Sequence, residues 1–471
     1  MPILSLALAL ATTPATEPEP AAWTILFYGA ADNSCEQTIV ADVAAMAEGF
    51  VEDQGVELVV LLDRSPRYES APLFGEDFAG TRLFRIRSGR AERLSGGDEL
   101  PALASGDGEV DVGDARTLAS FVRFGKARFP ARRTALVIYS HGDGRAMCAD
   151  ESSDGDELFP AEITAALEER DSVDLLAFDV CSMAGLENAY EWRRRPGSFG
   201  ADAMVASAPV SGPWPYAAIL RRLCAGGAAN GEPDATEGGT ERDLEPSRAD
   251  GIALARLILE EKRDQVCRTP ARAAKLSFES WCALDLARAA DAKAAVDRWA
   301  AGLEGEEAKA RLAVLRGYAG GELALNYVPR EPRAWTRMPF FDAYELARRD
   351  RDAVGEETAK QRAQEVCDAV DALVSASFGL ADYPGFEEGR HGAWILFPDG
   401  DAEERGLLGK PRRHWQAFTW YSPDDVSSVR GAYGRSAWCR DGRASGAVGN
   451  WHQRLEAWFG AAGATGAPEA R

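Results

Sequence analysis

Two stretches decide the fold: TALVIYSHGDG at Thr134–Gly144 and VDLLAFDVCSMAG at Val173–Gly185. Each opens with a short, nearly continuous apolar run and then changes abruptly to polar and turn-forming residues. Runs of this length and composition are typical of strands that are buried on both faces of a parallel sheet. The first strand leads into His141 and the second into Cys181, so two reactive side chains follow two predicted strands.

The same pattern extends along the first half of the chain. Further apolar runs lie at Trp23–Ala30, Val56–Asp63 and Ala203–Ala208, with a shorter strand at Thr81–Ile86. Helical patterns alternate with them at Gln37–Phe50, Ala115–Arg128 and Ala161–Glu169. This alternation predicts an α/β fold with a mostly parallel sheet flanked by helices. In such sheets, chemistry gathers at the carboxyl ends of the strands, which draws attention to the polar residues that follow them.

Charge and cysteine usage exclude several classes of protein. The 471 residues carry 75 acidic against 53 basic side chains and a net charge of −22. Nothing indicates a basic face for phosphates, so we expect peptides that carry basic residues, and not nucleic acid, as partners. The eight cysteines include no Cys-x-x-Cys pair, which argues against structural zinc and against a dense disulfide framework.

The chemistry concentrates between His141 and Cys181. If their strands are neighbours, the imidazole and the thiol come within reach of each other, and a nearby histidine raises the thiolate fraction of a cysteine. The backbone N–H groups of Gly142 and Cys181 could then hold a developing oxyanion. Taken singly, a cysteine that ends a strand is usually a small buried hydrophobe, and a lone histidine before a glycine is usually a cap or surface residue.

The surrounding sequence resembles the clostripain family of cysteine peptidases, caspase-like enzymes of the clan that also holds gingipains, legumains and separases. The resemblance rests on WTILFYGAADNSCE (23–36), the run 111–144, LLAFDVCSMAGLENAYEW (175–192) and GPWPY (212–216), with weaker echoes at 277–286 and 391–398. It implies a caspase-like sheet core, with His141 and Cys181 as a catalytic dyad. It also implies endoproteolysis after basic residues, with no cofactor required for the chemistry and with calcium favouring activity in some members.

Asp179 is the candidate for selecting basic residues. It stands two positions before Cys181, so on an extended strand both side chains point to the same side. A carboxylate beside the thiol would pair well with a guanidinium or ammonium group, and the resemblance places the basic-residue pocket at this aspartate. The alternative is a structural aspartate that caps a following helix, Ser182–Trp192.

Composition and hydrophobic pattern, together with the resemblance for the catalytic core, divide the chain into five parts. These are a leader or signal-like segment at 1–22, a caspase-like catalytic core at 23–224, a low-complexity loop at 225–250, a mainly helical region with a further strand at 251–460, and a disordered tail at 461–471. The apolar run Ile3–Ala11 is too short to span a bilayer but fits a signal peptide that lacks a basic start. We therefore expect export to the periplasm or the medium, with a cytoplasmic location as the alternative, and no stable membrane insertion.

Other signals are weaker. The acidic stretch Asp150–Glu157 offers oxygen ligands for calcium without the ordered spacing of an EF-hand loop, and a solvated turn is the alternative. Asp32 and Asn33 either line the active cleft or form an Asx turn. Arg145 is expected to be a more accessible site of self-cleavage than Arg170.

Two other functions are weighed against the peptidase. One is a catalytically silent binding protein on the same scaffold that recognises basic peptide segments; the presence of both His141 and Cys181 argues against it. The other is a different α/β hydrolase or transferase, but the chain contains no Gly-x-Ser-x-Gly elbow, Walker A loop or Gly-x-Gly-x-x-Gly fingerprint.

Overall fold

The computed structural model describes residues 20–52, 54–68, 71–209, 212–226, 246–268, 279–316, 340–380, 385–397 and 433–459. Almost all of the expected leader 1–22, most of the loop 225–250 and the tail 461–471 lie outside these residues.

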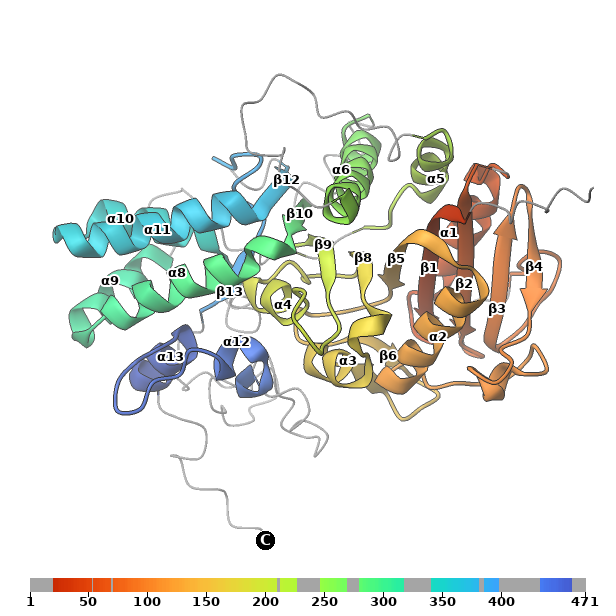
Figure 1. Ribbon diagram of the computed structural model, residues 1–471, viewed down its shortest axis with the longest axis horizontal. Coiled ribbons are helices and arrows are strands. Elements are labelled where there is room, and N and C mark those ends of the chain that lie inside the picture. Colours follow the sequence, from red (N-terminus) through yellow and green to blue (C-terminus); the bar gives the residue numbers. More distant parts are fainter. Residues whose placement is uncertain are drawn as a thin grey trace, which may run out of the picture.

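A nine-stranded sheet forms the centre of the molecule, in the order β12-β10-β9-β8-β5-β1-β2-β3-β4 (Figure 1). Its middle consists of parallel strands: β1 (Ala21–Ala31), β2 (Val56–Arg64), β5 (Ala131–Tyr139), β8 (Val173–Asp179) and β9 (Ala201–Ser207). Antiparallel strands close both edges: β3 (Gly80–Arg87) and β4 (Arg90–Leu94) on one side, β10 (Ser280–Asp285) and β12 (Val374–Gly379) on the other. The predicted α/β fold with a mostly parallel sheet is confirmed.

Helices cover both faces of this sheet. One face packs against α1 (Glu36–Gly49), α5 (Tyr216–Cys224) and α6 (Pro246–Cys267), the other against α2 (Ala115–Arg128), α3 (Pro160–Ala166) and α4 (Leu186–Glu191). Alternate residues of β1 therefore belong to different cores, Ile25 and Phe27 to the first and Leu26 and Tyr28 to the second. Burial on both faces explains why the central strands read as continuous apolar runs.

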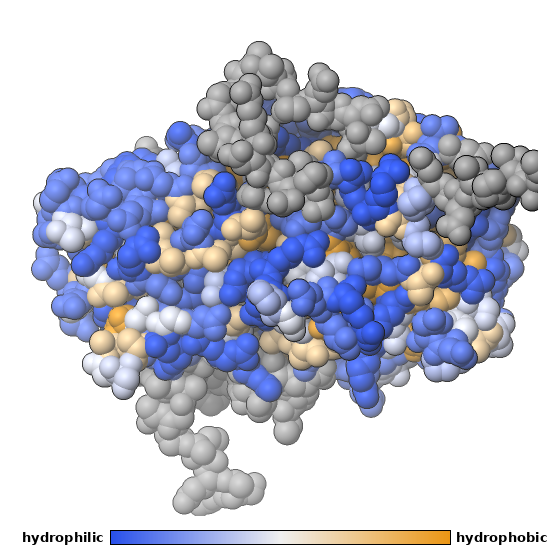
Figure 2. Space-filling model, in the orientation of Figure 1, coloured by the Kyte–Doolittle hydropathy of each residue, from blue (hydrophilic) through white to orange (hydrophobic). Residues whose placement is uncertain are grey.

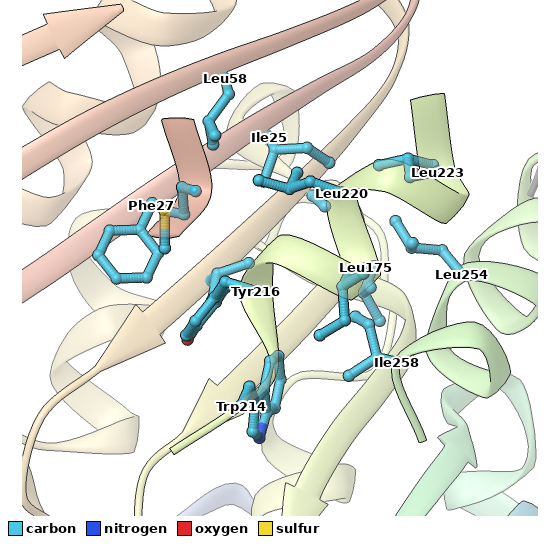
Figure 3. Close-up of a pocket in the computed structure, with 14 residues that line it drawn as sticks. Ile25, Phe27, Leu58, Leu175, Trp214, Tyr216, Leu220, Leu223, Leu254 and Ile258 are labelled. Atoms are coloured by element: carbon cyan, nitrogen blue, oxygen red, sulfur yellow. The ribbon is translucent and has the colours of Figure 1, made fainter. Parts of the chain in front are cut away.

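A small apolar cavity lies in the first of these cores. Figure 3 shows Leu220 and Leu223 of α5 and Leu254 and Ile258 of α6 facing Leu175 of β8 across it. Trp214 and Tyr216, at the start of α5, stand at its border. The cavity is thus a packing gap behind the segment that leads into α5.

The carboxyl-terminal half adds both strands and helices. Its helices are α8 (Ala289–Gly302), α9 (Gly305–Arg316), α10 (Ala343–Ala353), α11 (Glu357–Leu373), α12 (Ala437–Arg440) and α13 (Trp451–Phe459). In Figure 1 the first four of these form a layer beyond the β12 edge of the sheet. The expected further strand is present as β13 (Trp394–Leu396), paired with β11 (Phe340–Asp342). β10 and β12 continue the main sheet and were not expected from the sequence.

Short elements complete the fold. A hairpin, β6 (Met147–Asp150) and β7 (Asp156–Leu158), follows β5, and 3-10 turns occupy Pro101–Leu103, Glu169–Asp171, Leu286–Arg288 and Tyr433–Arg435. No helix in the part of the chain that the structure describes is long and apolar enough to cross a membrane. The face seen in Figure 2 is mostly hydrophilic, with apolar residues in small separate groups.

Trp394 fastens the carboxyl-terminal half to the core. The indole is fully buried and stacks on Phe340 with ring centroids 4.0 Å apart. Its Nε1–H donates to the Ser182 carbonyl (3.0 Å), and its backbone N–H donates to the Ala184 carbonyl (2.9 Å). Gly185 allows this approach, because a Cβ there would lie only 2.4 Å from the indole ring.

Replacing Gly185 with alanine should therefore destabilise the protein. The added methyl must displace a fully buried indole, and overpacking of this kind lowers the free energy of unfolding by about 1–3 kcal/mol. Chemical denaturation of wild type and Gly185→Ala measures the change. Gly355→Ala is the matched control, since nothing lies within 4 Å of a Cβ at Gly355; equal losses in both variants would contradict the role assigned to the Trp394 contact.

Candidate functional site

The pairing of β5 with β8 brings His141 and Cys181 to the same place. These strands run parallel, and their register sets Tyr139 opposite Asp179. Each candidate residue follows two positions later, just beyond the carboxyl end of its strand. The sheet thus joins two residues that are 40 positions apart in the sequence.

The turns after the two strands pack directly on each other. A Cβ on Gly142 would come within 2.3 Å of Val180 Cγ1, and one on Gly144 within 2.8 Å of the Ser182 carbonyl oxygen. The buried Asn188 amide ties the turns together by donating to the carbonyls of Gly144 (3.3 Å) and Met183 (3.1 Å). The close contact explains why the first turn is glycine-rich.

Ser182 gives the second turn its shape. With φ of 62° it adopts the left-handed conformation, which a residue with a side chain rarely occupies and which costs of order 1–3 kcal/mol. Its N–H donates to the Pro209 carbonyl (2.9 Å), and its carbonyl accepts from Trp394, as described above. The residue next to Cys181 is therefore held in an uncommon conformation by bonds on both sides.

His141 is positioned by a serine that follows β1. Ser34 Oγ lies 2.8 Å from His141 Nε2, within hydrogen-bonding distance. If Nε2–H donates to this hydroxyl, Nδ1 carries the free lone pair. Desolvation lowers the pKa of His141 below its usual 6.5, against a smaller opposing effect of Glu151. The imidazole is therefore mainly neutral at pH 7 and able to accept a proton.

Cys181 is one of three cysteines that are not buried. All eight cysteines are free thiols; Cys181 is half-buried, Cys267 is exposed, and five others are buried. The remaining one, Cys35, lies close to the site, where burial and the nearby Cys181 and Asp179 raise its pKa to about 12. Cys35 therefore stays a thiol at neutral pH.

Asp179 is buried, with 3% of its surface exposed. Its Oδ2 accepts hydrogen bonds from the Trp214 N–H (3.0 Å) and the Tyr216 hydroxyl (2.9 Å). Burial raises its pKa to about 8, although Lys262 and the two hydrogen bonds act in the opposite direction. The expected helix from Ser182 begins only at Leu186 with Gly185 as its N-cap, so Asp179 caps no helix and the capping alternative is wrong.

Lys262 of α6 fixes the segment that contacts Asp179. Its ammonium group is buried and donates hydrogen bonds to the carbonyls of Gly212 (2.9 Å) and Pro213 (3.0 Å). It also forms an ion pair with Glu279 (3.0 Å). These carbonyls immediately precede Trp214. The block GPWPY is thus held between a buried cation on one side and the Asp179 carboxylate on the other.

Asn33 and Asp32 have structural surroundings. Asn33 is buried, its Oδ1 accepts from the Cys35 N–H in an Asx turn, and its amide donates to Ser140 Oγ (3.1 Å) and to two carbonyls. Asp32 is also buried and accepts from the Ser152 N–H (2.8 Å). Both side chains are buried, so neither lines an open cleft. Asn33 forms the Asx turn that was the alternative expectation.

Asp32 instead belongs to a group of four carboxylates, here called the acidic cluster: Asp32, Asp63, Glu109 and Asp150. One carboxylate oxygen from each lies within 4.8 Å of the others. The predicted calcium stretch Asp150–Glu157 contributes only its first residue. The other three come from the ends of β1 and β2 and from the segment before α2.

The expectation that Arg145 is more accessible to self-cleavage than Arg170 is wrong. The Arg145 side chain is only 12% exposed and pairs with Asp143 (3.3 Å) and Glu157 (3.0 Å). Arg170, expected to be less accessible, is 70% exposed in a 3-10 turn. The ion pairs with Asp143 and Glu157 hold the Arg145 side chain against the protein, so little of it is exposed to solvent.

Sequence reasoning missed several residues that shape the site. Asn188 and Trp394 lie inside blocks that carried the family resemblance, but only the fold shows that they touch the turns beside Cys181. Ser34 directly follows the candidate residues Asp32 and Asn33, but its contact with His141 is visible only in the structure. Lys262 gave no signal, because a lysine within a helical pattern is usually solvated.

Comparison with known proteins identifies relatives over almost the whole chain. The profile described as the Clostripain family matches residues 27–458. The chain is 34% identical over 461 residues to clostripain of Hathewaya histolytica, which covers 93% of this chain and 86% of the relative.

Solved structures share the fold. An inactive zymogen C11 protease from Parabacteroides distasonis superposes with a TM-score of 0.51 at 15% identity, over 81% of this chain and 94% of the other. A secreted C11 cysteine protease from Bacteroides thetaiotaomicron, in complex with an irreversible peptide inhibitor, gives 0.51 at 18% identity over the same shares. The extent of these matches shows that the chain belongs to the clostripain family and is a cysteine-type endopeptidase.

Proposed function

We propose that the chain cleaves peptide bonds after basic residues through a dyad of His141 and Cys181. The observation that carries the proposal is the parallel register of β5 with β8. Because of this register the two strands end side by side, and the turns that contain His141 and Cys181 pack against each other. Cys181 is only partly buried, and the His141 imidazole, whose pKa burial lowers, can accept the proton of its thiol in the first step.

The chemistry follows from these groups. His141 takes the proton of the Cys181 thiol, and the thiolate sulfur attacks the carbonyl carbon of the scissile bond. The resulting oxyanion is held by the backbone N–H groups of Cys181 and Gly142; the Gly142 N–H donates to no residue in the described ranges and is available. His141 then gives its proton to the leaving amine, and a thioester to Cys181 forms as the C–N bond breaks.

Water completes the cycle. With His141 again as base, a water molecule attacks the thioester carbon, the carboxylic acid leaves, and the proton returns to the sulfur. The protein side chains supply every proton transfer, and the family's chemistry needs no cofactor.

Asp179 is proposed to hold the basic residue that precedes the scissile bond. The hydrogen bonds from Trp214 and Tyr216 both reach Oδ2, and no residue among those described donates to Oδ1. A buried carboxylate with one oxygen left over favours a guanidinium or ammonium partner, because such charge-assisted bonds are strong where water is excluded. Peptides with arginine or lysine, and not nucleic acid, are therefore the proposed partners.

Export is proposed for the same chain. The segment 1–22, with an apolar run followed by small residues, has the character of a signal peptide. Amino-terminal sequencing of protein recovered from the periplasm or medium tests this proposal; recovery of the intact start from the cytoplasm alone would reject it.

Cys181→Ala should lower peptide hydrolysis by more than about a thousandfold while the protein stays folded, because the thiol supplies all of the covalent chemistry. His141→Ala should be nearly as damaging, since neither the thiol nor the leaving amine then has a proton partner. Fluorogenic arginyl peptides give the rates. Cys267→Ser, a change at the exposed thiol outside the site, is the control and should retain full activity. Hydrolysis that persists in pure Cys181→Ala would contradict the dyad.

A second prediction concerns pH and selectivity. Because the pKa of Asp179 is about 8, its carboxyl is largely protonated at pH 7 and must ionise to bind a cationic residue. The KM for an arginyl peptide should therefore fall as the pH rises through about 8, whereas the KM for a matched peptide with a neutral residue should not.

In Asp179→Asn, the KM for the arginyl peptide should no longer fall as the pH rises through about 8. The same change should lower kcat/KM for that peptide by about a hundredfold. Asp98→Asn, at an exposed aspartate, is the matched control. An unchanged ratio of arginyl to neutral hydrolysis in Asp179→Asn would place the specificity pocket elsewhere.

A further inference from the structure

A second carboxylate, Asp42 of α1, lies near Asp179. Asp42 is partly buried and stands three positions after Ile39 and four before Met46, so the three residues share one face of the helix. Ile39 and Met46 are buried, and Met46 lines the apolar cavity together with Tyr216. A carboxylate on a packed, apolar face needs a reason, because burial of charge costs free energy unless a partner or ligand offsets it.

Two stacked tyrosines join Asp42 to Asp179. The Tyr216 hydroxyl donates to Asp179 Oδ2 (2.9 Å), and the Tyr139 hydroxyl donates to the Asp42 carboxylate. The rings of Tyr139 and Tyr216 are both buried and stack on each other, with centroids 6.1 Å apart and planes inclined by 22°. Phe27 packs edge-on against both rings, with centroid distances of 6.3 and 5.6 Å. The two carboxylates are thus oriented by hydroxyl groups of one rigid aromatic cluster.

The two carboxylates also act on each other. Burial is the main cause that raises the pKa of Asp179 to about 8; Lys262 opposes the rise, and Asp42 adds to it. Burial likewise raises the pKa of the Tyr139 and Tyr216 hydroxyls, and both carboxylates add to that effect. A cation placed between the carboxylates would relieve their repulsion.

A guanidinium group can contact both carboxylates at once. It is planar and carries five N–H donors that point in different directions, so one edge can pair with Asp179 while another nitrogen pairs with Asp42. An ammonium group is a compact point charge, and it pairs closely with one carboxylate. We propose that Asp42 is a second specificity residue, which together with Asp179 holds the guanidinium of an arginine that precedes the scissile bond. This assignment rests on the proposed function.

Asp42→Asn tests the assignment. We would measure kcat/KM for matched fluorogenic peptides with arginine, lysine or citrulline before the scissile bond, at about pH 9, where the Asp179 carboxyl is mainly ionised. We expect kcat/KM to fall by about tenfold or more for the arginyl peptide, by less for the lysyl peptide and little for the neutral citrullyl peptide. Glu48→Gln, at an exposed carboxylate of the same helix, is the matched control and should leave all three values unaltered.

Tyr139→Phe guards against a structural effect of Asp42→Asn. It keeps the stacked ring and removes only the hydroxyl that orients Asp42, so it should lower the ratio of arginyl to lysyl hydrolysis in the same direction by a smaller factor. The double variant of Asp42→Asn with Asp179→Asn adds a further test. Because both carboxylates would hold one guanidinium, the combined loss should be smaller than the product of the two single losses.

A pH profile separates this role from packing. Asp179 is surrounded by titratable groups from several elements: Asp42 and Cys35 of α1 and the turn before it, Tyr139 of β5, Tyr216 of α5, Lys262 of α6, and Cys181 after its own strand. Removal of the negative charge of Asp42 favours the ionised form of Asp179, so the pKa of Asp179 falls. In Asp42→Asn, KM for the arginyl peptide should therefore decrease at a lower pH than in the wild type, a shift that loss of packing alone does not produce.

The outcomes distinguish this assignment from the proposed function. An unchanged ratio of arginyl to lysyl hydrolysis in both Asp42→Asn and Tyr139→Phe, in an enzyme still selective for basic residues, would overturn the role of Asp42 and leave the proposed function intact. A wild-type protein that cleaves the citrullyl peptide as fast as the arginyl peptide would reject the proposed selectivity and this assignment with it.

Discussion

The parallel pairing of β5 with β8 is the constraint on which the rest of the site depends. It sets Tyr139 opposite Asp179 and so brings the following turns together. A slip of one residue would turn every side chain of a strand to the other face, and burial of both faces makes such a slip costly. The core therefore fixes the relative position of His141 and Cys181 more firmly than any contact between the two turns.

The turns themselves need support from the distant half of the chain. Ser182 is held in a left-handed conformation partly by Trp394, and the Gly185–Trp394 contact leaves no room for a methyl group. Strain of this kind persists only where the surroundings impose it. The carboxyl-terminal region is thus a structural part of the site, which agrees with a family match that extends to residue 458.

Local pattern predicted the centre of the fold but not its edges. The long apolar runs of β1, β5 and β8 were identified because burial on both faces leaves an unambiguous composition. β12, VSASFG, is short and rich in small residues, so nothing in its sequence distinguishes it from the helix that precedes it. His141 and Cys181 could be found because they end predicted strands. The acidic cluster could not, because its residues come from four segments that only the tertiary structure brings together.

Asp179 and three members of the acidic cluster, Asp32, Asp63 and Asp150, are buried without an ion pair in the described part of the chain, whereas Glu109 is exposed. Asp179 retains an oxygen to which no described residue donates, and Asp32 and Asp63 each retain a buried oxygen without a partner. A protein stabilises buried charge by pairing or neutralises it by protonation, and burial raises the pKa of Asp179 to about 8, so this carboxyl becomes anionic above that pH or beside a cationic partner. In the proposed function this partner is the basic side chain of a substrate, and Trp214 and Tyr216, which both donate to Asp179 Oδ2, leave Oδ1 to receive it.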